Sequence, residues 1–199
     1  MSKTMKRWID FILSLGGILV LSPLLIFIAL WIKLDSKGPV FFTQKRVGIN
    51  KATFLIYKFR TMRTDTPKDT PTHLLSDATR FITKSGAFLR KTSLDELPQL
   101  FNILFGQMSV IGPRPALWNQ FDLIAERDLY GANDVRPGLT GWAQINGRDE
   151  LPIDVKAKLD GEYVKRMSLR FDAEIFFKTI FSVLRSEGVK EGAHDRKED

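Results

Sequence analysis

The sequence predicts an α+β fold that is mainly helical, and three observations support this prediction. Residues 11–32 form an uncharged apolar run that is long enough for a membrane helix. Two β-prone segments on either side of a glycine- and asparagine-containing stretch predict a small hairpin over residues 40–59. Most of the remaining chain has helical periodicity, and two amphipathic segments near its C-terminal end are expected to lie at a membrane interface.

The composition limits the chemistry that this chain can carry out. Its 199 residues have the size of one ordinary domain, and the absence of cysteine excludes disulfides, thiolate zinc sites and cysteine nucleophiles. With only two histidines, His73 and His194, a histidine-rich metal site or a Ser-His-Asp triad is disfavoured. The net charge of +7 indicates a polyanionic partner, which is a nucleic acid, a nucleotide phosphate or an anionic membrane surface.

The apolar run at residues 11–32 would extend ~33 Å as a straight helix, about the thickness of a bilayer core. Its length and the lack of a small-residue cleavage site argue against a signal peptide. Pro23 in the middle of the run predicts a kink, and the Ser22 hydroxyl is a candidate partner for a backbone group that the proline frees. Cations occur on both sides of the run, which draws both ends toward the cytoplasm. These residues are Lys6, Arg7, Lys33, Lys37, Lys45 and Arg46.

Two modes of insertion are compatible with this pattern. A helix that is broken at Ser22-Pro23 can enter and leave the bilayer on one face, since each arm of ~16 Å reaches about halfway across. A kinked helix that spans the bilayer is the alternative, because proline is also tolerated in spanning helices. The sequence pattern alone leaves both open.

The remaining elements follow from turn signals and periodicity. We expect a membrane helix in residues 1–36, one domain over residues 37–186 and a charged tail over 187–199. Within the domain we expect strands at 40–43 and 53–59, a surface loop at 64–80, helices at 92–105 and 116–130, a glycine-punctuated loop with a short strand at 136–148, and amphipathic helices at 154–167 and 172–186.

The candidate chemistry lies in Thr92–Asn102, which reads TSLDELPQLFN. Ser93 followed by Glu96 matches a capping box, which predicts that a helix starts at 92–93. Asp95 and Glu96 then lie in the first helical turn, with Gln99 on the same polar stripe as Asp95. An aspartate can attack phosphorus covalently, and a neighbouring carboxylate can hold Mg²⁺ beside a diphosphate. The alternative is that both acids merely complement the helix dipole.

The longer segment KTSLDELPQLFNILFGQMSVIGPRP resembles the signature of the bacterial sugar transferases, the monotopic phosphoglycosyl transferases. The resemblance covers nearly the whole chain, since it also includes the Ser22-Pro23 run, VFFTQKRVG, IYKFRTM, VRPGLTGWAQINGR and LRSEGVKEG. The chain is similar to the short form, which lacks an added N-terminal membrane bundle. That form resembles the undecaprenyl phosphate N,N′-diacetylbacillosamine 1-phosphate transferases that start protein N-glycan assembly in some bacteria.

The resemblance implies a specific reaction at the cytoplasmic face of the bacterial inner membrane. Enzymes of this kind transfer a sugar 1-phosphate from a UDP-sugar to undecaprenyl phosphate, release UMP and require Mg²⁺. Carried over to this chain, Asp95 is the nucleophile that forms a phosphosugar-aspartyl intermediate, and Glu96 is the carboxylate associated with the metal. The Ser22-Pro23 break then marks a re-entrant helix beside a cytoplasmic catalytic domain. The product would begin a glycoprotein, O-antigen or capsule, so downstream glycosyltransferases are candidate partners.

Cations are needed near the acidic pair because a carboxylate that attacks a diphosphate faces like-charge repulsion. We expect Arg90 and Arg114 to contact phosphate first, because their positions match the resembled motif and because a guanidinium can form bidentate phosphate contacts. Gln99 is a further expected contact. The remaining expected phosphate contacts are Arg60, Arg136 and Arg148, whereas Lys58 and Lys91 are undecided.

Three alternatives are weighed against this hypothesis. The resemblance also fits a UDP-glucose- or UDP-galactose-specific initiator of exopolysaccharide, and the short form favours an N-acetylated donor such as UDP-N,N′-diacetylbacillosamine. A membrane-anchored nucleic-acid binder is disfavoured, since the cations are spread along the chain and no binding module is recognisable. A noncatalytic scaffold would not need Asp95 and Glu96.

Trp142 could stack on uracil, lie at the bilayer interface or pack in the core.

Overall fold

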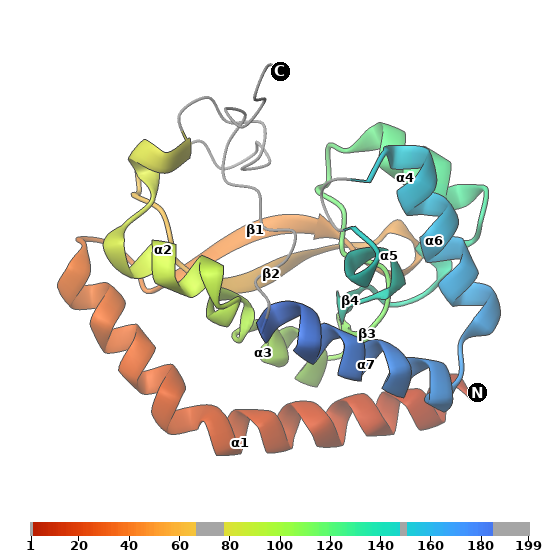
Figure 1. Cartoon of the computed structure of the whole chain (residues 1–199), viewed down its shortest axis with the longest axis horizontal. Helices are drawn as coiled ribbons and strands as arrows, with labels where there is room; N and C mark the ends of the chain where they lie inside the picture. The colour runs from red at the N-terminus through yellow and green to blue at the C-terminus, as the bar shows by residue number, and fades with distance from the viewer. Residues whose placement is uncertain (1, 67–77, 148–150, 185–199) are drawn as a thin grey trace.

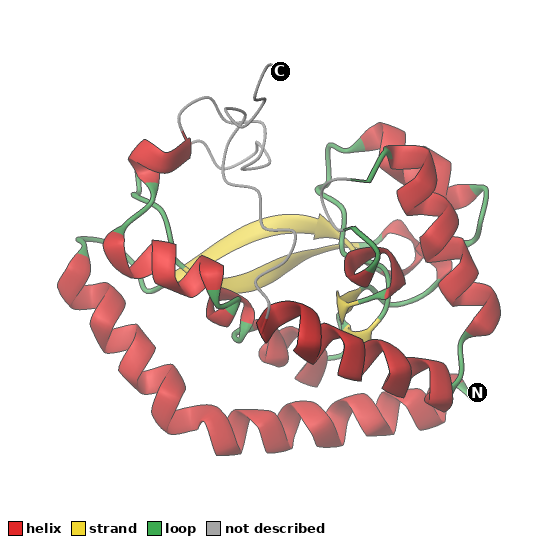
Figure 2. Ribbon diagram, in the orientation of Figure 1, coloured by secondary structure: helices red, strands yellow, loops and turns green. Residues whose placement is uncertain are grey.

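A computed structural model describes residues 2–66, 78–147 and 151–184 of the chain. Figure 1 shows helix α1 along one edge of the molecule, with a two-stranded hairpin crossing the middle. Helix α2 lies at one end of the hairpin, and helices α4 and α6 lie at the other. Figure 2 shows that helices form most of the secondary structure and strands a small part of it, which confirms the predicted mainly helical α+β class.

The elements alternate between helices, short 3-10 turns (η) and strands along the chain. The helices are α1 (Lys3–Asp35), α2 (Lys84–Lys91), α3 (Gln99–Leu104), α4 (Phe121–Asp128), α5 (Trp142–Ile145), α6 (Ile153–Arg166) and α7 (Leu169–Leu184). The strands are β1 (Phe41–Val47), β2 (Thr53–Phe59), β3 (Ser109–Ile111) and β4 (Gly138–Thr140). The 3-10 turns are η1 (Ile49–Lys51), η3 (Ala78–Phe81), η4 (Leu94–Glu96) and η5 (Ala132–Asp134).

Helix α1 is continuous through Pro23, and Figure 1 shows it bent along its length. In a regular helix the Leu19 carbonyl would accept a hydrogen bond from the backbone N–H of residue 23, which proline lacks. The Ser22 hydroxyl donates to that carbonyl at 2.8 Å instead. This confirms the expected role of the Ser22 hydroxyl, and it shows that the helix accommodates Pro23 without being interrupted.

Both ends of α1 are bonded to the rest of the molecule. Near its N-terminus, Asp10 is buried and accepts hydrogen bonds from the Ser109 hydroxyl and the Val110 N–H, both at 3.0 Å. Near its C-terminus, Asp35 accepts from the Ser85 N–H at 3.0 Å and from the Ser85 hydroxyl at 2.8 Å. The helix is therefore held near both ends by one body of protein.

One face of α1 contributes to the hydrophobic core. Ile28 and Ile32 are buried against Phe59 of β2 and Leu89 of α2. The helix is long and apolar enough to cross a membrane by length and composition, but only 11% of its most apolar window is buried inside the protein. The other face exposes large apolar side chains, which include Trp8, Ile12, Leu19, Val20, Ile26, Phe27, Leu30 and Leu34.

The predicted hairpin is confirmed, although its first strand continues to Val47 rather than ending at residue 43. Strands β1 and β2 are antiparallel, with Phe41 opposite Phe59. Asn50 and Lys51, in the connection, adopt positive φ angles of 53° and 62°. The short strand expected within residues 136–148 is β4, which pairs in parallel with β3.

The single helix predicted over residues 92–105 is wrong. The structure has the 3-10 turn η4 followed by the short helix α3, which begins after Pro98. A regular helix cannot begin at Ser93 because this residue has a left-handed backbone (φ 56°) and its side chain forms no cap hydrogen bond. The predicted capping box is therefore absent.

Other boundaries differ by smaller amounts. The helix expected at 116–130 is shorter (α4), because the Ala116 carbonyl accepts a hydrogen bond from Val47 of the hairpin. Helices α2 and α5 were not predicted. The two amphipathic helices are confirmed as α6 and α7. The tail 187–199 and much of the loop 64–80 lie outside the described residues.

Asn102 joins α3 to the hairpin. Its side chain is fully buried, and its Oδ1 accepts from the Tyr57 N–H at 2.9 Å. Its Nδ2 donates to the Leu55 carbonyl at 2.8 Å and to Gln107 Oε1 at 2.7 Å. One amide thus satisfies an N–H and a carbonyl of β2, as a neighbouring strand would.

We predict that Asn102→Ala lowers the free energy of unfolding by about 2–4 kcal/mol, because it leaves two backbone groups of β2 without their partners. Urea titration of the detergent-solubilised protein, followed by circular dichroism, measures this change. The matched control is Asn146→Ala, which removes one exposed hydrogen bond to the Trp142 carbonyl. Equal effects of the two substitutions would contradict the assigned role of Asn102.

Candidate active site

The acidic pair Asp95-Glu96 lies on η4, where the chain turns between α2 and α3. The turn begins at Ser93 in the left-handed conformation, which costs a non-glycine residue about 1–2 kcal/mol. The Ser93 carbonyl accepts the Glu96 N–H at 3.2 Å, and the Leu94 carbonyl accepts the Leu97 N–H at 3.3 Å. Strained backbone of this kind concentrates at functional sites, so the turn itself marks η4 as a candidate.

Glu96 is the centre of the charge network. Its Oε1 accepts from Lys58 Nζ at 2.7 Å and from Arg114 Nη2 at 2.8 Å. Lys58 comes from β2, and Arg114 comes from the loop that follows β3, so three distant segments meet at one oxygen. Among the described residues, none donates a hydrogen bond to the second oxygen, Oε2.

Asp95 differs from its neighbour, because no described residue donates a hydrogen bond to its carboxylate. Its side chain is partly buried, and burial is the main cause that raises its pKa to about 6. The charge of Lys58 opposes this rise, whereas that of Glu96 adds to it. Burial also acts to raise the pKa of Glu96, but the charges of Arg114 and Lys58 outweigh it and hold this pKa well below its usual range.

Arg90 and Arg114 are the two expected phosphate contacts that the structure brings to the acidic pair. The charges of both act on Asp95 and lower its pKa. Arg90 lies in the last turn of α2, whose C-terminal end leads into η4. The Arg114 side chain is 37% exposed, so part of its guanidinium is accessible in addition to the contact with Glu96.

Arg60 contacts the chain that leaves α1. Its Nη1 donates to the Lys37 carbonyl, and its Nη2 donates to the carbonyl and hydroxyl of Ser36 at 2.8 and 2.9 Å. The side chain is only 4% exposed. These contacts hold the end of the long helix, and they do not bring Arg60 to the acidic pair.

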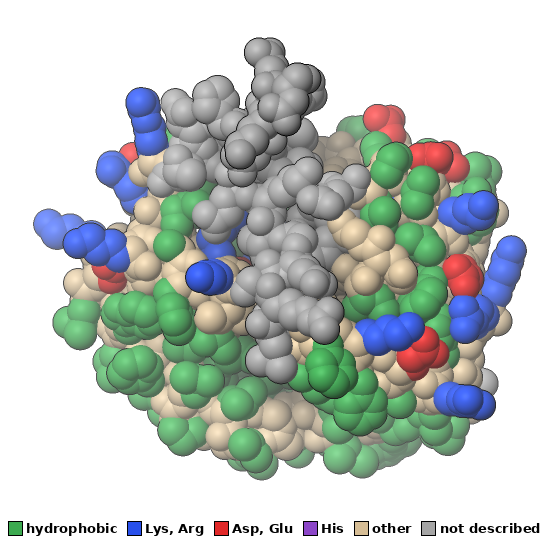
Figure 3. All heavy atoms as spheres, in the orientation of Figure 1, with side chains coloured by type: hydrophobic (Ala, Val, Ile, Leu, Met, Phe, Trp, Pro, Cys, Tyr) green, Lys and Arg blue, Asp and Glu red, His purple; other side chains and the backbone are tan. Residues whose placement is uncertain are grey.

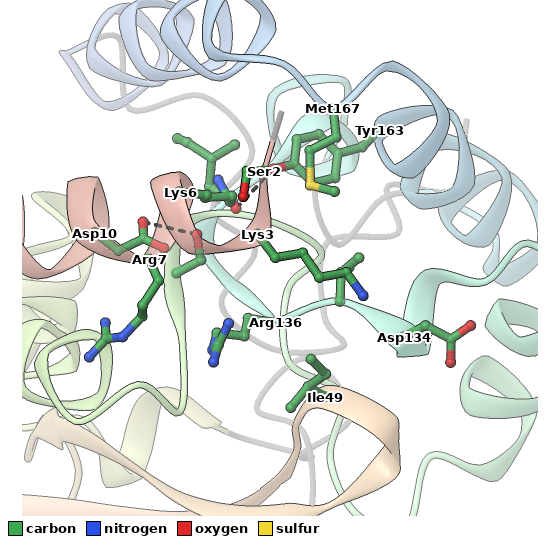
Figure 4. Close-up of a pocket in the computed structure, with 13 residues that line it drawn as sticks. Ser2, Lys3, Lys6, Arg7, Asp10, Ile49, Asp134, Arg136, Tyr163 and Met167 are labelled. Atoms are coloured by element: carbon green, nitrogen blue, oxygen red, sulfur yellow. Dashed lines mark hydrogen bonds between the residues drawn. The ribbon is translucent and has the colours of Figure 1, made fainter.

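Arg136 lies in a separate pocket at the N-terminal end of α1 (Figure 4), where its Nε donates to the Gly106 carbonyl at 2.9 Å. Lys3, Asp134 and Tyr163 line the same pocket, whereas neither Asp95 nor Glu96 does. The structure therefore does not bring Arg136 together with the acidic pair. Arg148 lies outside the described residues.

Gln99 is the first residue of α3, and its side chain is 1% exposed. Its Nε2 has no hydrogen-bond partner among the described residues. A buried amide without a partner needs a physical explanation, and one explanation is a group that is bound during function. Its position one turn after Asp95 fits the expected contact with a substrate.

Sequence reasoning left Lys58 undecided and did not assign it to the site. The signal was its position within IYKFRTM, near the end of β2 and directly before the buried Phe59. Trp142 packs on Phe171 with ring centroids 5.0 Å apart, and its Nε1 donates to Glu162 at 3.0 Å. These contacts identify a packing role for Trp142, one of the three roles left open above.

Asp95 and Glu96 are the residues that could hold a divalent cation. No group of three or more His, Cys, Asp or Glu side chains with metal-binding geometry occurs among the described residues. Two carboxylates fit Mg²⁺, which commonly binds one or two carboxylates together with substrate phosphates and several waters. Glu96 Oε2, which has no donor from the described residues, fits this requirement.

Comparison with known proteins gives a family match over most of the chain. A model of the family described as "Bacterial sugar transferase" matches residues 1–186. The uncharacterised sugar transferase EpsL of Bacillus subtilis is 40% identical over 190 residues, covering 96% of this chain and 92% of that protein. The UDP-glucose:undecaprenyl-phosphate glucose-1-phosphate transferase of Escherichia coli is 40% identical over 188 residues.

The alignment with the E. coli protein covers 90% of this chain and 40% of that protein. The UDP-N-acetylgalactosamine-undecaprenyl-phosphate N-acetylgalactosaminephosphotransferase of Aeromonas hydrophila is 39% identical over 191 residues, covering 93% and 45%. The chain therefore spans less than half the length of these two relatives but nearly all of the B. subtilis protein.

Proposed function

This chain belongs to the bacterial sugar transferase family, and from that membership and the geometry of its acidic pair we propose that it transfers a sugar 1-phosphate from a UDP-sugar to undecaprenyl phosphate. It is a phosphoglycosyl transferase, and UMP is the released product. The reaction begins a glycoconjugate such as a glycoprotein, an O-antigen or a capsule, with glycosyltransferases acting on the product afterwards.

The observation that carries the proposal is the unequal environment of the two acids. Glu96 is held by Lys58 and Arg114, whereas Asp95 has no hydrogen-bond donor from the described residues and has free lone pairs for attack. Asp95 attacks the phosphorus next to the sugar, a P–O bond forms to its carboxylate, and the bond to UMP breaks. The oxygen of undecaprenyl phosphate then attacks the same phosphorus and regenerates the Asp95 carboxylate.

The surrounding cations make this attack possible. Two carboxylates and a diphosphate repel one another, so positive charge must be fixed at the site before the substrate arrives. Arg114, Arg90 and Lys58 supply that charge, and the buried Gln99 amide is placed to donate a hydrogen bond to the donor substrate. We propose that Glu96, with Asp95 beside it, holds Mg²⁺, which neutralises charge on the diphosphate when bound.

The site acts at the inner membrane, on its cytoplasmic face. Figure 3 shows hydrophobic side chains gathered over the part of the surface formed by α1 and α7. Exposed aromatic residues extend this surface beyond α1. They are Phe88 of α2, Phe105 after α3, and Phe176, Phe177 and Phe181 of α7.

We propose a monotopic, re-entrant α1 rather than a spanning one. Its two ends are bonded to the same body of protein, through Asp10 near one end and Asp35 near the other. A helix that crosses the bilayer would place its ends on opposite sides of the membrane, where one compact domain cannot bond to both. The bend along α1 and the basic residues on both sides of the apolar run support the same topology.

The covalent mechanism predicts a stoichiometric first step. Enzyme, UDP-sugar and Mg²⁺ without undecaprenyl phosphate should release UMP up to about one equivalent, and the peptide that contains Asp95 should gain the mass of a sugar phosphate. Asp95→Asn should abolish both signals because it removes the anionic nucleophile. Glu96→Gln should weaken the Mg²⁺ dependence and the rate, with residual adduct on Asp95. Single-turnover assays and peptide mass spectrometry measure these outcomes.

The matched control is Asp122→Asn, which changes an exposed carboxylate on α4 and should leave UMP release unchanged. An adduct on Glu96 would reverse the two roles. Active enzyme that gives neither adduct nor acceptor-independent UMP would rule out the covalent step.

We propose an N-acetylated donor, such as UDP-N,N′-diacetylbacillosamine; in support of this class of donor, the A. hydrophila relative is named for UDP-N-acetylgalactosamine. In a UMP-release assay with undecaprenyl phosphate, kcat/KM for the N-acetylated UDP-sugars should exceed that for UDP-glucose and UDP-galactose by roughly tenfold or more, because a site that binds the acetamido group is left with unpaired groups by the other sugars. A preference for UDP-glucose or UDP-galactose would instead identify an exopolysaccharide initiator.

The re-entrant topology predicts where single cysteines can be labelled. The chain has no cysteine, so Lys3→Cys and Lys37→Cys each introduce a unique thiol. An impermeant maleimide should label neither variant in intact spheroplasts and should label both after permeabilisation. Labelling at position 3 from outside, with position 37 protected, would show a spanning helix. Pro23→Ala should shift the pattern toward spanning, since the proline bend is lost.

A further inference from the structure

The loop that carries Arg114 is held in place through its carbonyl groups. It reads Gly-Pro-Arg-Pro-Ala over residues 112–116, and its two prolines have no N–H with which to form internal hydrogen bonds. Four consecutive carbonyls accept hydrogen bonds from other segments. The pairs are Pro113 with the Gly138 N–H, Arg114 with Arg127 Nη1, Pro115 with Arg46 Nη1, and Ala116 with the Val47 N–H.

The base of this loop is fixed by close backbone contact. A Cβ atom at Gly138 would lie 2.1 Å from the Gly112 nitrogen, and one at Gly141 would lie 2.1 Å from the Gly112 oxygen. A side chain at either position would therefore force the two segments apart. Two glycines of VRPGLTGWAQINGR, Gly138 and Gly141, thus serve close packing beneath the Arg114 loop.

Arg127 is the donor that reaches the carbonyl of Arg114 itself. It lies on α4, is 3% exposed, and donates to Asp160 Oδ2 of α6 through Nε at 2.8 Å and Nη2 at 2.6 Å. Its remaining nitrogen, Nη1, donates to the Arg114 carbonyl at 2.9 Å. Asp160 is 1% exposed. The buried Arg127–Asp160 pair, called the strut below, therefore connects α4 to α6, and Arg127 Nη1 connects both helices to the Arg114 loop.

Stability alone is a weak explanation for such a pair. A buried ion pair gains little net stability, since desolvation offsets the attraction, and apolar residues of similar volume often replace one without loss. Burial raises the pKa of Asp160 although Arg127 opposes this change, which reflects the same desolvation cost. What apolar side chains cannot replace is the hydrogen bond to the loop.

We propose that Arg127 is a positioning residue, oriented by Asp160, which sets the backbone of Arg114 so that its guanidinium meets Glu96 and the donor phosphates. Arg114 has a long flexible side chain, and its Nη2 contacts Glu96 at 2.8 Å. A displacement of about 1 Å at a catalytic group can lower a rate by roughly a hundredfold. This proposal rests on the phosphoglycosyl transfer proposed above.

The test is a mutant cycle between the strut and Arg114. The double variant Arg127→Met/Asp160→Leu replaces the buried pair by apolar side chains and removes the bond to the Arg114 carbonyl. We expect kcat for UMP release to fall by about 10–100-fold. Arg114→Ala should lower kcat by about 10²–10³-fold. Adding the double variant to Arg114→Ala should cause no further loss, because the strut then has no guanidinium to position.

A general loss of structure would behave differently, since its fold-decrease in kcat would multiply with the fold-decrease caused by Arg114→Ala. Losses that multiply, or a double variant with wild-type kcat, would overturn the proposal. Arg127→Lys provides a second variant if the double variant does not fold. It keeps a positive charge beside Asp160, but its single nitrogen does not reproduce the guanidinium fork that reaches both Asp160 and the Arg114 carbonyl. The same absence of a further fall in kcat is expected on the Arg114→Ala background. Multiplying losses in this variant would also overturn the proposal.

The matched control is Lys51→Ala, which removes an exposed ion pair with Asp128 of the same helix α4 and should leave kcat unchanged. Thermal unfolding of each variant establishes that the compared proteins are folded. If wild-type enzyme released no UMP from any UDP-sugar, the proposed function would fail. Wild-type activity without the expected non-additivity would overturn only the role of Arg127.

Discussion

Ion pairs from two segments of the fold meet at one carboxylate oxygen of Glu96. Glu96 Oε1 binds Lys58 of the hairpin and Arg114 of the loop after β3, so it fixes the distance between two segments that are remote in sequence. A largely buried carboxylate is stable only when it is paired, and two cations at close range are stable only with an anion between them. The three charges therefore stabilise one another, and Asp95 lies beside this cluster with no hydrogen-bond donor from the part of the chain that the structure describes.

The long helix α1 completes the body that holds this cluster. Its buried face packs on β2 and α2, the elements that supply Lys58 and lead into η4, while Arg60 of the chain after β2 holds the segment that leaves the helix. The apolar outer face and the catalytic turn are thus parts of one rigid unit. In the proposed monotopic topology, a site organised in this way is held at a constant depth relative to the lipid around α1.

The sequence was sufficient wherever a signal was long or periodic. The apolar run, the hairpin and the amphipathic helices α6 and α7 follow from patterns that extend over many residues. The turn at Ser93 could not be predicted, because a capping-box pattern and a left-handed serine have the same local sequence. Helix α2 is short and contains a glycine, Gly86, whose Cβ would clash with the Thr61 carbonyl, so packing rather than propensity explains it. Likewise, the sequence favoured Arg114 and Arg90 at the site, but only tertiary contacts separate them from Arg60 and Arg136.

The packing of α1 also has a consequence for biosynthesis. Helix α1 leaves the ribosome before the domain that follows it, and this domain cannot close its core until Ile28 and Ile32 are in place. In the monotopic arrangement proposed above, α1 packs against lipid on one face and against Phe59 and Leu89 on the other, so membrane insertion and folding are coupled. A nascent chain that misses the membrane exposes both the outer face of α1 and an unfinished core, which makes it a substrate for chaperones and proteases rather than a soluble enzyme.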